Sequence, residues 1–115
     1  GTPDRSYNAT EITWQVDFNK QLDQLNGAVF NDPIQAGQAF KDGTVEIYKL
    51  DVQLDGSVKQ GEEVTSSFTS TNEDGSLRIA FGDITNAYRV KFKTSLEDED
   101  QSKFQNEATV MSDNV

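Results

Sequence analysis

The chain has 115 residues, of which 34% are hydrophobic and 10% aromatic, and 20 acidic against 10 basic residues leave a formal net charge of −10. This length predicts one domain, residues 1–115, that buries roughly two-thirds of its unfolded surface without a disulfide or metal. The charge argues against nucleic acid and anionic membranes as partners, because few cations are present to neutralise phosphates and long-range repulsion opposes approach.

Cysteine and histidine are both absent from the sequence. Their absence removes zinc sites, thiol nucleophiles and histidine-based catalytic triads, and with them most hydrolase chemistries. We expect no metal and no cofactor. No apolar run reaches membrane-spanning length. A chain without cysteine is compatible with the cytosol and also with bacterial surface proteins that avoid thiols.

The first expected strand runs from Ile12 to Phe18, where apolar and polar side chains alternate with the two-residue period of a half-buried strand. It carries Trp14, the only tryptophan. A polar turn over residues 19–27 leads to a second apolar run that contains Phe30 and ends in Asn31-Asp32-Pro33. We expect Trp14 and Phe30 in the core, and Asp32 at the rim of the core, where its surroundings can shift its pKa.

The rest of the chain shows short alternating runs separated by turn signals, and no helical period is sustained. Residues 33–40 are expected to form a loop or short helical turn. Further strands are expected at residues 44–53, 58–61, 64–69, 76–82, 87–95 and 106–111, with turns at 55–56 and 72–75 and a break at 82–83. Seven or eight short strands at this spacing predict an all-β sandwich.

Most of the polar motifs have an ordinary structural explanation. Residues 51–57 faintly resemble a calcium loop but lack its alternating oxygen ligands and terminal glutamate, so a hairpin turn is favoured. The acidic run at residues 96–100 is best interpreted as a solvated loop. Taken singly, Asp32 before a proline is a turn former, and Asn106 early in a strand is an ordinary edge residue.

Five segments resemble, in order and over nearly the whole chain, the collagen-adhesin A-region type domain of Gram-positive surface proteins. They are ITWQVDFN (12–19), NGAVFNDPI (26–34), TVEIYKLDV (44–52), FGDITNAYRVKFKT (81–94) and FQNEATV (104–110). The resemblance implies an immunoglobulin-like sandwich within a wall-anchored adhesin or pilus component. It also implies an extracellular location at the bacterial cell wall surface.

The resemblance also implies a chemistry, because many such domains contain a spontaneous isopeptide bond between a lysine on the first strand and an asparagine on the last. By position, Asp32 resembles the buried acid that promotes this bond, and Asn106 resembles the carboxamide acceptor. Trp14 and Phe30 would supply the apolar surroundings. Burial raises the pKa of a carboxyl, and a protonated Asp32 could donate a hydrogen bond to the Asn106 carbonyl. The reaction occurs once, without turnover.

The sequence departs from the family at the lysine, since none of the residues before Ile12 is a lysine. Arg5 cannot replace it, because a guanidinium stays protonated and offers no neutral amine. All lysines follow the Trp14 strand: Lys20, Lys41, Lys49, Lys59, Lys91, Lys93 and Lys103.

Two explanations of the missing lysine strand remain open. The domain could be a split form that takes a lysine-bearing strand peptide, or a neighbouring adhesin segment, into an open edge. It could instead be a domain that lost this strand or never formed the bond. We expect the first. Alternative functions are binding of an extracellular matrix protein, collagen or fibrinogen, in a groove between sandwiches, and an inert spacer.

Overall fold

The computed structural model describes residues 11–34, 38–41, 43–73, 75–96 and 108–113. These residues contain nine strands and a single 3-10 turn. The strands are β1 (Glu11–Phe18), β2 (Leu25–Pro33), β3 (Gln38–Phe40), β4 (Glu46–Val52), β5 (Val58–Glu63), β6 (Thr69–Glu73), β7 (Ser76–Ile84), β8 (Ala87–Leu96) and β9 (Thr109–Met111), and the 3-10 turn η1 is Thr65–Ser67. Among the described residues, no helix has the length and apolar character needed to cross a membrane.

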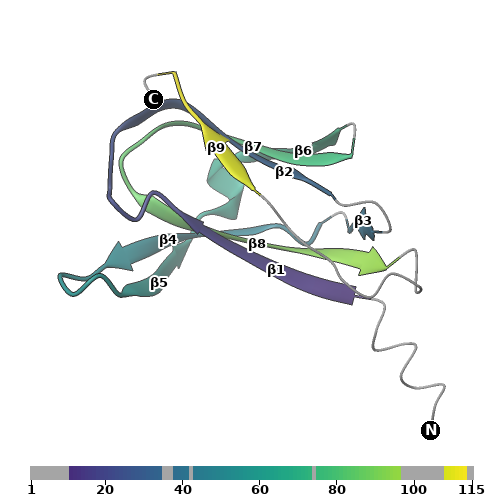
Figure 1. The fold of residues 1–115 in the computed structure, drawn as a ribbon, viewed down its shortest axis with the longest axis horizontal. Helices are drawn as coiled ribbons and strands as arrows, with labels where there is room; N and C mark the ends of the chain where they lie inside the picture. Colours follow the sequence, from purple (N-terminus) through teal and green to yellow (C-terminus); the bar gives the residue numbers. More distant parts are fainter. Residues whose placement is uncertain (1–10, 35–37, 42, 74, 97–107, 114–115) are drawn as a thin grey trace, which may run out of the picture.

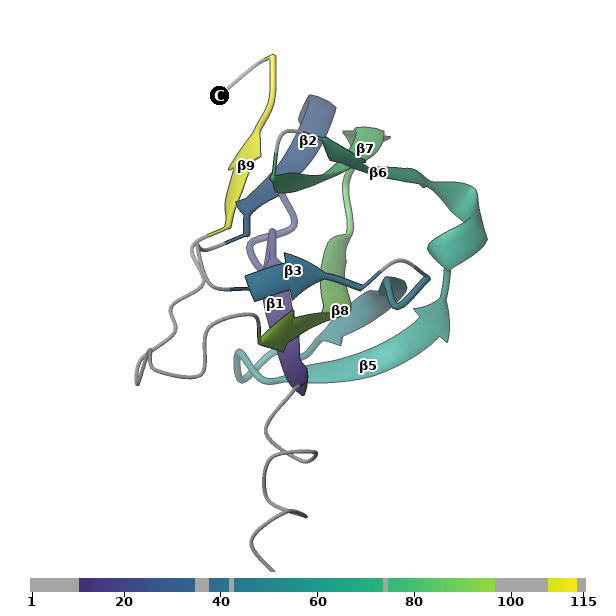
Figure 2. The ribbon, with the colours of Figure 1, turned by 90° about the vertical axis from the view of Figure 1, so that its right-hand side faces the viewer.

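The strands form two antiparallel sheets that face each other as a sandwich (Figure 1). The larger sheet has the order β1-β8-β4-β5, and β3 pairs with the end of β8 that β4 leaves uncovered. The smaller sheet has the order β6-β7-β2-β9. Viewed from the side, the two layers lie one above the other (Figure 2). The expected all-β sandwich is therefore confirmed.

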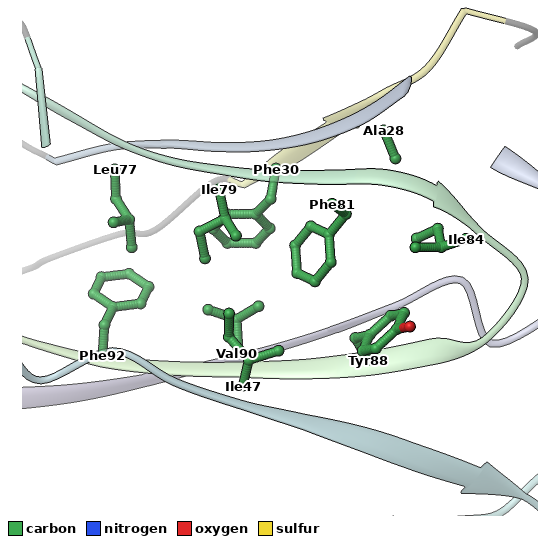
Figure 3. Close-up of a cluster of buried hydrophobic side chains, with 10 residues drawn as sticks. All are labelled: Ala28, Phe30, Ile47, Leu77, Ile79, Phe81, Ile84, Tyr88, Val90 and Phe92. Carbon is green, nitrogen blue, oxygen red and sulfur yellow. The ribbon is translucent and has the colours of Figure 1, made fainter. Parts of the chain in front are cut away.

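The core lies between the sheets and follows from the two-residue period of the strands, which turns alternate side chains inward. Figure 3 shows Leu77 of β7 above Phe92 of β8, and Phe81 above Tyr88. The cluster consists of Ala28, Phe30, Ile47, Leu77, Ile79, Phe81, Ile84, Tyr88, Val90 and Phe92. The alternation expected in the strands at residues 76–82 and 87–95 is thus confirmed.

One expected strand, residues 64–69, is wrong. The structure instead forms η1 there, because the Thr65 hydroxyl accepts a hydrogen bond from the Ile47 backbone N–H at 2.9 Å and competes with strand pairing. The turn places Phe68 against Phe81, with ring centroids 4.6 Å apart. Offset aromatic pairs of this kind add to the free energy of area burial.

Other boundaries also differ from the sequence-based expectation. β6 continues to Glu73, so the expected turn over residues 72–75 is shorter. β7 runs through the expected break to Ile84, because Gly82 adopts a φ of +72° in a bulge that shifts the register with β2. Residues 38–40 form β3 rather than a loop or helical turn. This strand is too short for its side-chain alternation to be detected.

Candidate functional site

Asp32 lies inside the sandwich, on β2. Its side chain follows Ala28 and Phe30 on the inward face, and its exposed fraction is 0%. The neighbouring strand places Leu77 opposite it. The expectation that this carboxyl sits at the rim of the core is therefore wrong, because β2 continues through Pro33 and the strand period turns residue 32 inward.

The buried carboxyl lies at the Phe92 end of the sandwich, since Leu77 is its register partner and Phe92 lies beneath Leu77 (Figure 3). Two residues beyond Phe92, Thr94 is also buried, with 1% of its surface exposed. The Trp14 indole N–H donates to the Thr94 hydroxyl at 2.9 Å. Among the described residues, Asp32 and Thr94 are the buried polar side chains of the core.

Trp14 and Phe30 both contribute to the apolar interior, though to different degrees. Phe30 is fully buried, as expected. Trp14 is only partly buried and packs against the edge of the core from β1. Among the described residues, β1 is an edge strand of the larger sheet. Its inward-facing side chains therefore have a neighbouring strand on one side only. The expectation of a buried Trp14 is therefore met only in part.

The second residue of the predicted pair, Asn106, lies outside the described residues, as does Lys103. Asn106 lies three positions before the first residue of β9, and β9 pairs with β2 through Asn31 and Thr109.

The six described lysines do not lie in the interior. Lys20, Lys41, Lys49 and Lys59 are exposed. Lys91 lies over the ring of Tyr48, and Lys93 approaches Glu11.

A second candidate surface is the outer face of the larger sheet, which we define by Thr13, Gln15 and Asp17 of β1, Glu46 and Tyr48 of β4, and Arg89, Lys91 and Lys93 of β8. The register places Gln15, Lys91 and Glu46 in one row across three strands. In the next row Arg89 pairs with Asp17, through Nε at 2.8 Å and through a second nitrogen at 3.0 Å. Such a two-point contact fixes both side chains in one geometry.

Tyr48 lies on β4 in the same row as Arg89 and Asp17 and is partly buried. Its hydroxyl donates to Glu46 Oε1 at 2.6 Å, and the Lys91 ammonium lies 5.3 Å from the ring centroid. The hydrogen bond to Glu46, helped by desolvation and by the negative charges of Glu46 and Glu63, raises the pKa of Tyr48 to about 12. The phenol of Tyr48 therefore stays neutral, and its ring is held in a fixed orientation.

Acid and base residues also pair at the other end of the outer face. Lys41 and Lys93 both approach Glu11, the latter at 3.5 Å, and the hydrogen bond from Lys41 is the main reason that the pKa of Glu11 is lowered. The exposed Thr13 and Gln15 lie between this pair and the Tyr48 contacts. Sequence reasoning missed this face, although the alternating cations of β8 were a signal for it.

The possible metal-binding segments give no support for a cation site. Among the described residues, no group of three or more acidic, cysteine or histidine side chains could hold a metal ion. The segment resembling a calcium loop is a hairpin turn, in which Asp55 Oδ1 accepts from the backbone and hydroxyl of Ser57 at 2.9 and 2.7 Å. The interpretation of this segment as a turn is confirmed. Most of the acidic run, residues 97–100, lies outside the described residues.

Comparison with known proteins gives a consistent result. A family model described as collagen binding domain matches residues 1–115. The collagen-binding domain of a Staphylococcus aureus adhesin has a TM-score of 0.63 and 18% identity, and the match covers 90% of this chain and 77% of that one. No curated protein sequence matches the chain.

Two further solved structures have the same fold. The collagen binding domain of Erysipelothrix rhusiopathiae surface protein RspB has a TM-score of 0.63 and 18% identity over 88% of this chain. ACE19, the collagen binding subdomain of Enterococcus faecalis surface protein ACE, has a TM-score of 0.59 and 10% identity, with coverage of 88% and 85%. The chain spans only 34% of the RspB structure, about a third of its length.

Proposed function

This chain belongs to the collagen binding domain family, and from that premise we propose that it is an extracellular adhesin module that binds a matrix protein of the collagen class. The observation that carries the proposal is the family match over residues 1–115. The module would act at a bacterial cell wall surface. Binding, not catalysis, is the function of such a domain.

The outer face of the larger sheet is the surface that we assign to the ligand. Collagen is a long rod of three polyproline-II-like chains whose backbone is hydrated. A rod needs an open, elongated track, and polyproline-II chains are commonly recognised by surfaces lined with aromatic rings. The outer face presents the oriented Tyr48 ring on β4, and the exposed polar side chains of Thr13 and Gln15 lie on β1, on the other side of β8.

Tyr48→Ala tests this assignment directly. Tyrosines that anchor an interface typically contribute about 2 kcal/mol, so the variant should bind immobilised triple-helical collagen about 30-fold more weakly. Surface plasmon resonance with the isolated chain measures the change. Arg78→Ala is the matched control, because Arg78 is an exposed residue of β7 in the other sheet, where its Nε donates a hydrogen bond to Asn31 Oδ1 at 3.2 Å.

The outcomes separate the alternatives. Loss of binding for Tyr48→Ala but not Arg78→Ala supports the outer face. Wild-type affinity in both variants would place the ligand on another surface. Saturable binding to fibrinogen instead of collagen would identify fibrinogen as the ligand. If the chain binds neither protein and forms no covalent adduct in the experiment below, the remaining alternative is an inert spacer.

A second candidate function is formation of the Lys–Asn isopeptide bond with a lysine supplied by another strand. The observation that favours it is the complete burial of the Asp32 carboxyl in the apolar interior. Burial disfavours a charged carboxylate, so Asp32 can serve as a proton donor there. The described lysines all lie outside the interior, which is why we propose a lysine-bearing peptide or a neighbouring adhesin segment as the partner.

In this reaction the neutral lysine amine attacks the side-chain carbonyl carbon of Asn106. A C–N bond forms to the lysine nitrogen, the bond to the Asn106 amide nitrogen breaks, and ammonia leaves with a proton from the lysine. Asp32 would donate a hydrogen bond to the carbonyl oxygen during the attack and relay a proton to the leaving group. Trp14 and Phe30 would keep water from the reacting groups.

The experiment mixes the chain with a lysine-bearing strand peptide of the family and analyses the product by denaturing gel and intact mass. A covalent adduct lighter than the sum of its parts by one ammonia is expected. Asp32→Ala and Asn106→Ala should both abolish it. Complete separation of the wild-type mixture under denaturing conditions would rule out cross-linking with that peptide.

A further inference from the structure

We propose that Asn26 is a site of spontaneous deamidation, in which the Gly27 backbone nitrogen is the nucleophile and the carboxylate of Asp83 restrains the reaction. Asn26-Gly27 is the only Asn-Gly pair in the sequence. The inference is independent of the proposed function, since it concerns the bulge at the beginning of β2.

The reaction closes a five-membered ring within the chain. The Gly27 nitrogen bonds to the side-chain carbonyl carbon of Asn26, the bond from that carbon to the amide nitrogen breaks, and ammonia leaves with the proton of the Gly27 N–H. Water then opens the cyclic imide at either carbonyl, which gives aspartate or isoaspartate. Glycine is the most favourable following residue, because it has no side chain to hinder the nucleophile and has the greatest backbone freedom.

The fold favours a glycine at this position and so favours retention of the reactive pair. Gly27 adopts a φ of +60° in the bulge where the register between β2 and β7 shifts. A Cβ atom there would lie 2.5 Å from Asp113 Oδ2, closer than real Cβ contacts allow. The left-handed backbone conformation favours glycine, whereas the contact itself could be relieved by a shift of the Asp113 carboxylate at the end of its side chain.

The same bulge also restrains the nucleophile. The Gly27 N–H donates to Asp83 Oδ1 at 2.9 Å, so attack requires that this hydrogen bond break first. The Asn26 backbone carbonyl accepts from the Asp113 N–H at 2.7 Å, and its side-chain oxygen accepts from Gln24 at 3.1 Å. These contacts oppose the rotations of the main chain and of the Asn26 side chain that ring closure requires.

Deamidation would alter the strand that carries the buried carboxyl. The product adds a negative charge beside Asp83 and Asp113, and isoaspartate adds one methylene to the main chain of β2. Because register depends on the spacing of backbone groups, this insertion weakens the pairing of β2 with β9. The expected result is a less stable folded domain.

The experiment incubates the folded chain at mildly alkaline pH and follows the mass gain of one dalton, with peptide mapping to locate the modified residue. Removal of the restraint in Asp83→Ala should accelerate deamidation at Asn26 about three- to tenfold, the factor that corresponds to one net hydrogen bond. The chain unfolded in urea should react faster than either folded protein. Asp83→Asn retains an acceptor oxygen and should react close to the wild-type rate.

Asp55→Ala is the matched control, because Asp55 also accepts a backbone N–H at 2.9 Å but lies in the distant hairpin turn. It should leave the rate at Asn26 unchanged, which separates the local restraint from general loss of stability. Folded fractions are measured by circular dichroism so that rates are compared only between folded proteins. Equal rates in wild type and Asp83→Ala, or a mass gain that maps to another asparagine, would overturn the proposal.

Discussion

At the scale of single side chains, the structure gives residues of the same type different environments. Asp17 makes a two-point ion pair with Arg89 on the outer face, with 15% of its side chain exposed. Asp55 closes a turn, where hydrogen bonds from the hydroxyl and backbone of Ser57 lower its pKa. Asp32 is enclosed in the apolar core. Burial away from water disfavours a charged carboxylate in general, and the proposed cross-link relies on that effect at Asp32.

Tyr48 provides a pH-dependent prediction at this scale. Its folded-state pKa of about 12 lies above the ordinary value of 10.0, so the fold favours the neutral phenol. This contribution to stability is fully present below pH 10 and is lost as the pH rises towards 12. Glu46→Gln removes the charged acceptor and should shift the Tyr48 titration towards the ordinary value.

The titration is followed by phenolate absorbance, with Tyr48→Phe subtracted to isolate the signal of this residue. Circular dichroism shows over which pH range the chain remains folded. An unchanged midpoint in Glu46→Gln would mean that Glu46 is not the cause of the shift.

At the scale of secondary-structure elements, β8 organises the larger sheet. It pairs with β1 along one side and with β4 and β3 along the other. Its inward residues Tyr88, Val90 and Phe92 form the floor of the core, while its alternate residues Arg89, Lys91 and Lys93 form the outer face. One strand therefore contributes to both stability and the proposed ligand surface. The two roles do not interfere, because successive side chains of a strand point to opposite faces of the sheet.

The bulge in β7 provides a prediction at the scale of elements. Gly82→Ala should destabilise the domain by about 1–2 kcal/mol, because an alanine in the left-handed region places its Cβ against the following carbonyl. The space around Gly82 is open, so backbone conformation rather than collision with neighbours is the cause. Chemical denaturation measures the change in the free energy of unfolding.

Gly82→Asn is the internal control for this prediction. Asparagine tolerates the left-handed conformation better than alanine, so its cost should be smaller even though its side chain is larger. A greater loss for the asparagine variant would show that side-chain volume, not φ, is the limiting factor.

At the scale of the whole molecule, the net charge of −10 acts on stability as well as on partner choice. Like charges spread over a small domain repel one another and destabilise the compact state. Added sodium chloride screens this repulsion within a Debye length of about 8 Å at physiological ionic strength. We therefore expect the thermal midpoint to rise between low and physiological salt.

This salt dependence is measured by circular dichroism melting curves in sodium chloride. A thermal midpoint that falls with salt would show that attractive pairs such as Arg89 with Asp17 outweigh the overall repulsion. Uncharged sucrose at matched osmolarity controls for general solute effects.

The sequence alone was sufficient for the all-β class and for the inward faces of β7 and β8, because the alternation of Leu77, Ile79 and Phe81 is a local property. It was not sufficient for η1, since the hydrogen bond from Ile47 to Thr65 joins residues 18 positions apart. β3 also required its partner, β8, to be recognised as a strand. Family resemblance directed attention to Asp32, whereas residue patterns alone favoured an ordinary turn.

For the candidate sites, the sequence determined which chemical groups are present, and the tertiary structure determined their surroundings. Asp32 was expected at the rim of the core and lies in the interior. The reason is that the alternation of inward and outward side chains in β2 continues beyond the apolar run, which ends at Phe30. The contacts of Tyr48 with Lys91 and Glu46 depend on the pairing of β4 with β8. Burial and cross-strand contact are properties of segments brought together by folding, and a single segment's pattern does not encode its neighbours.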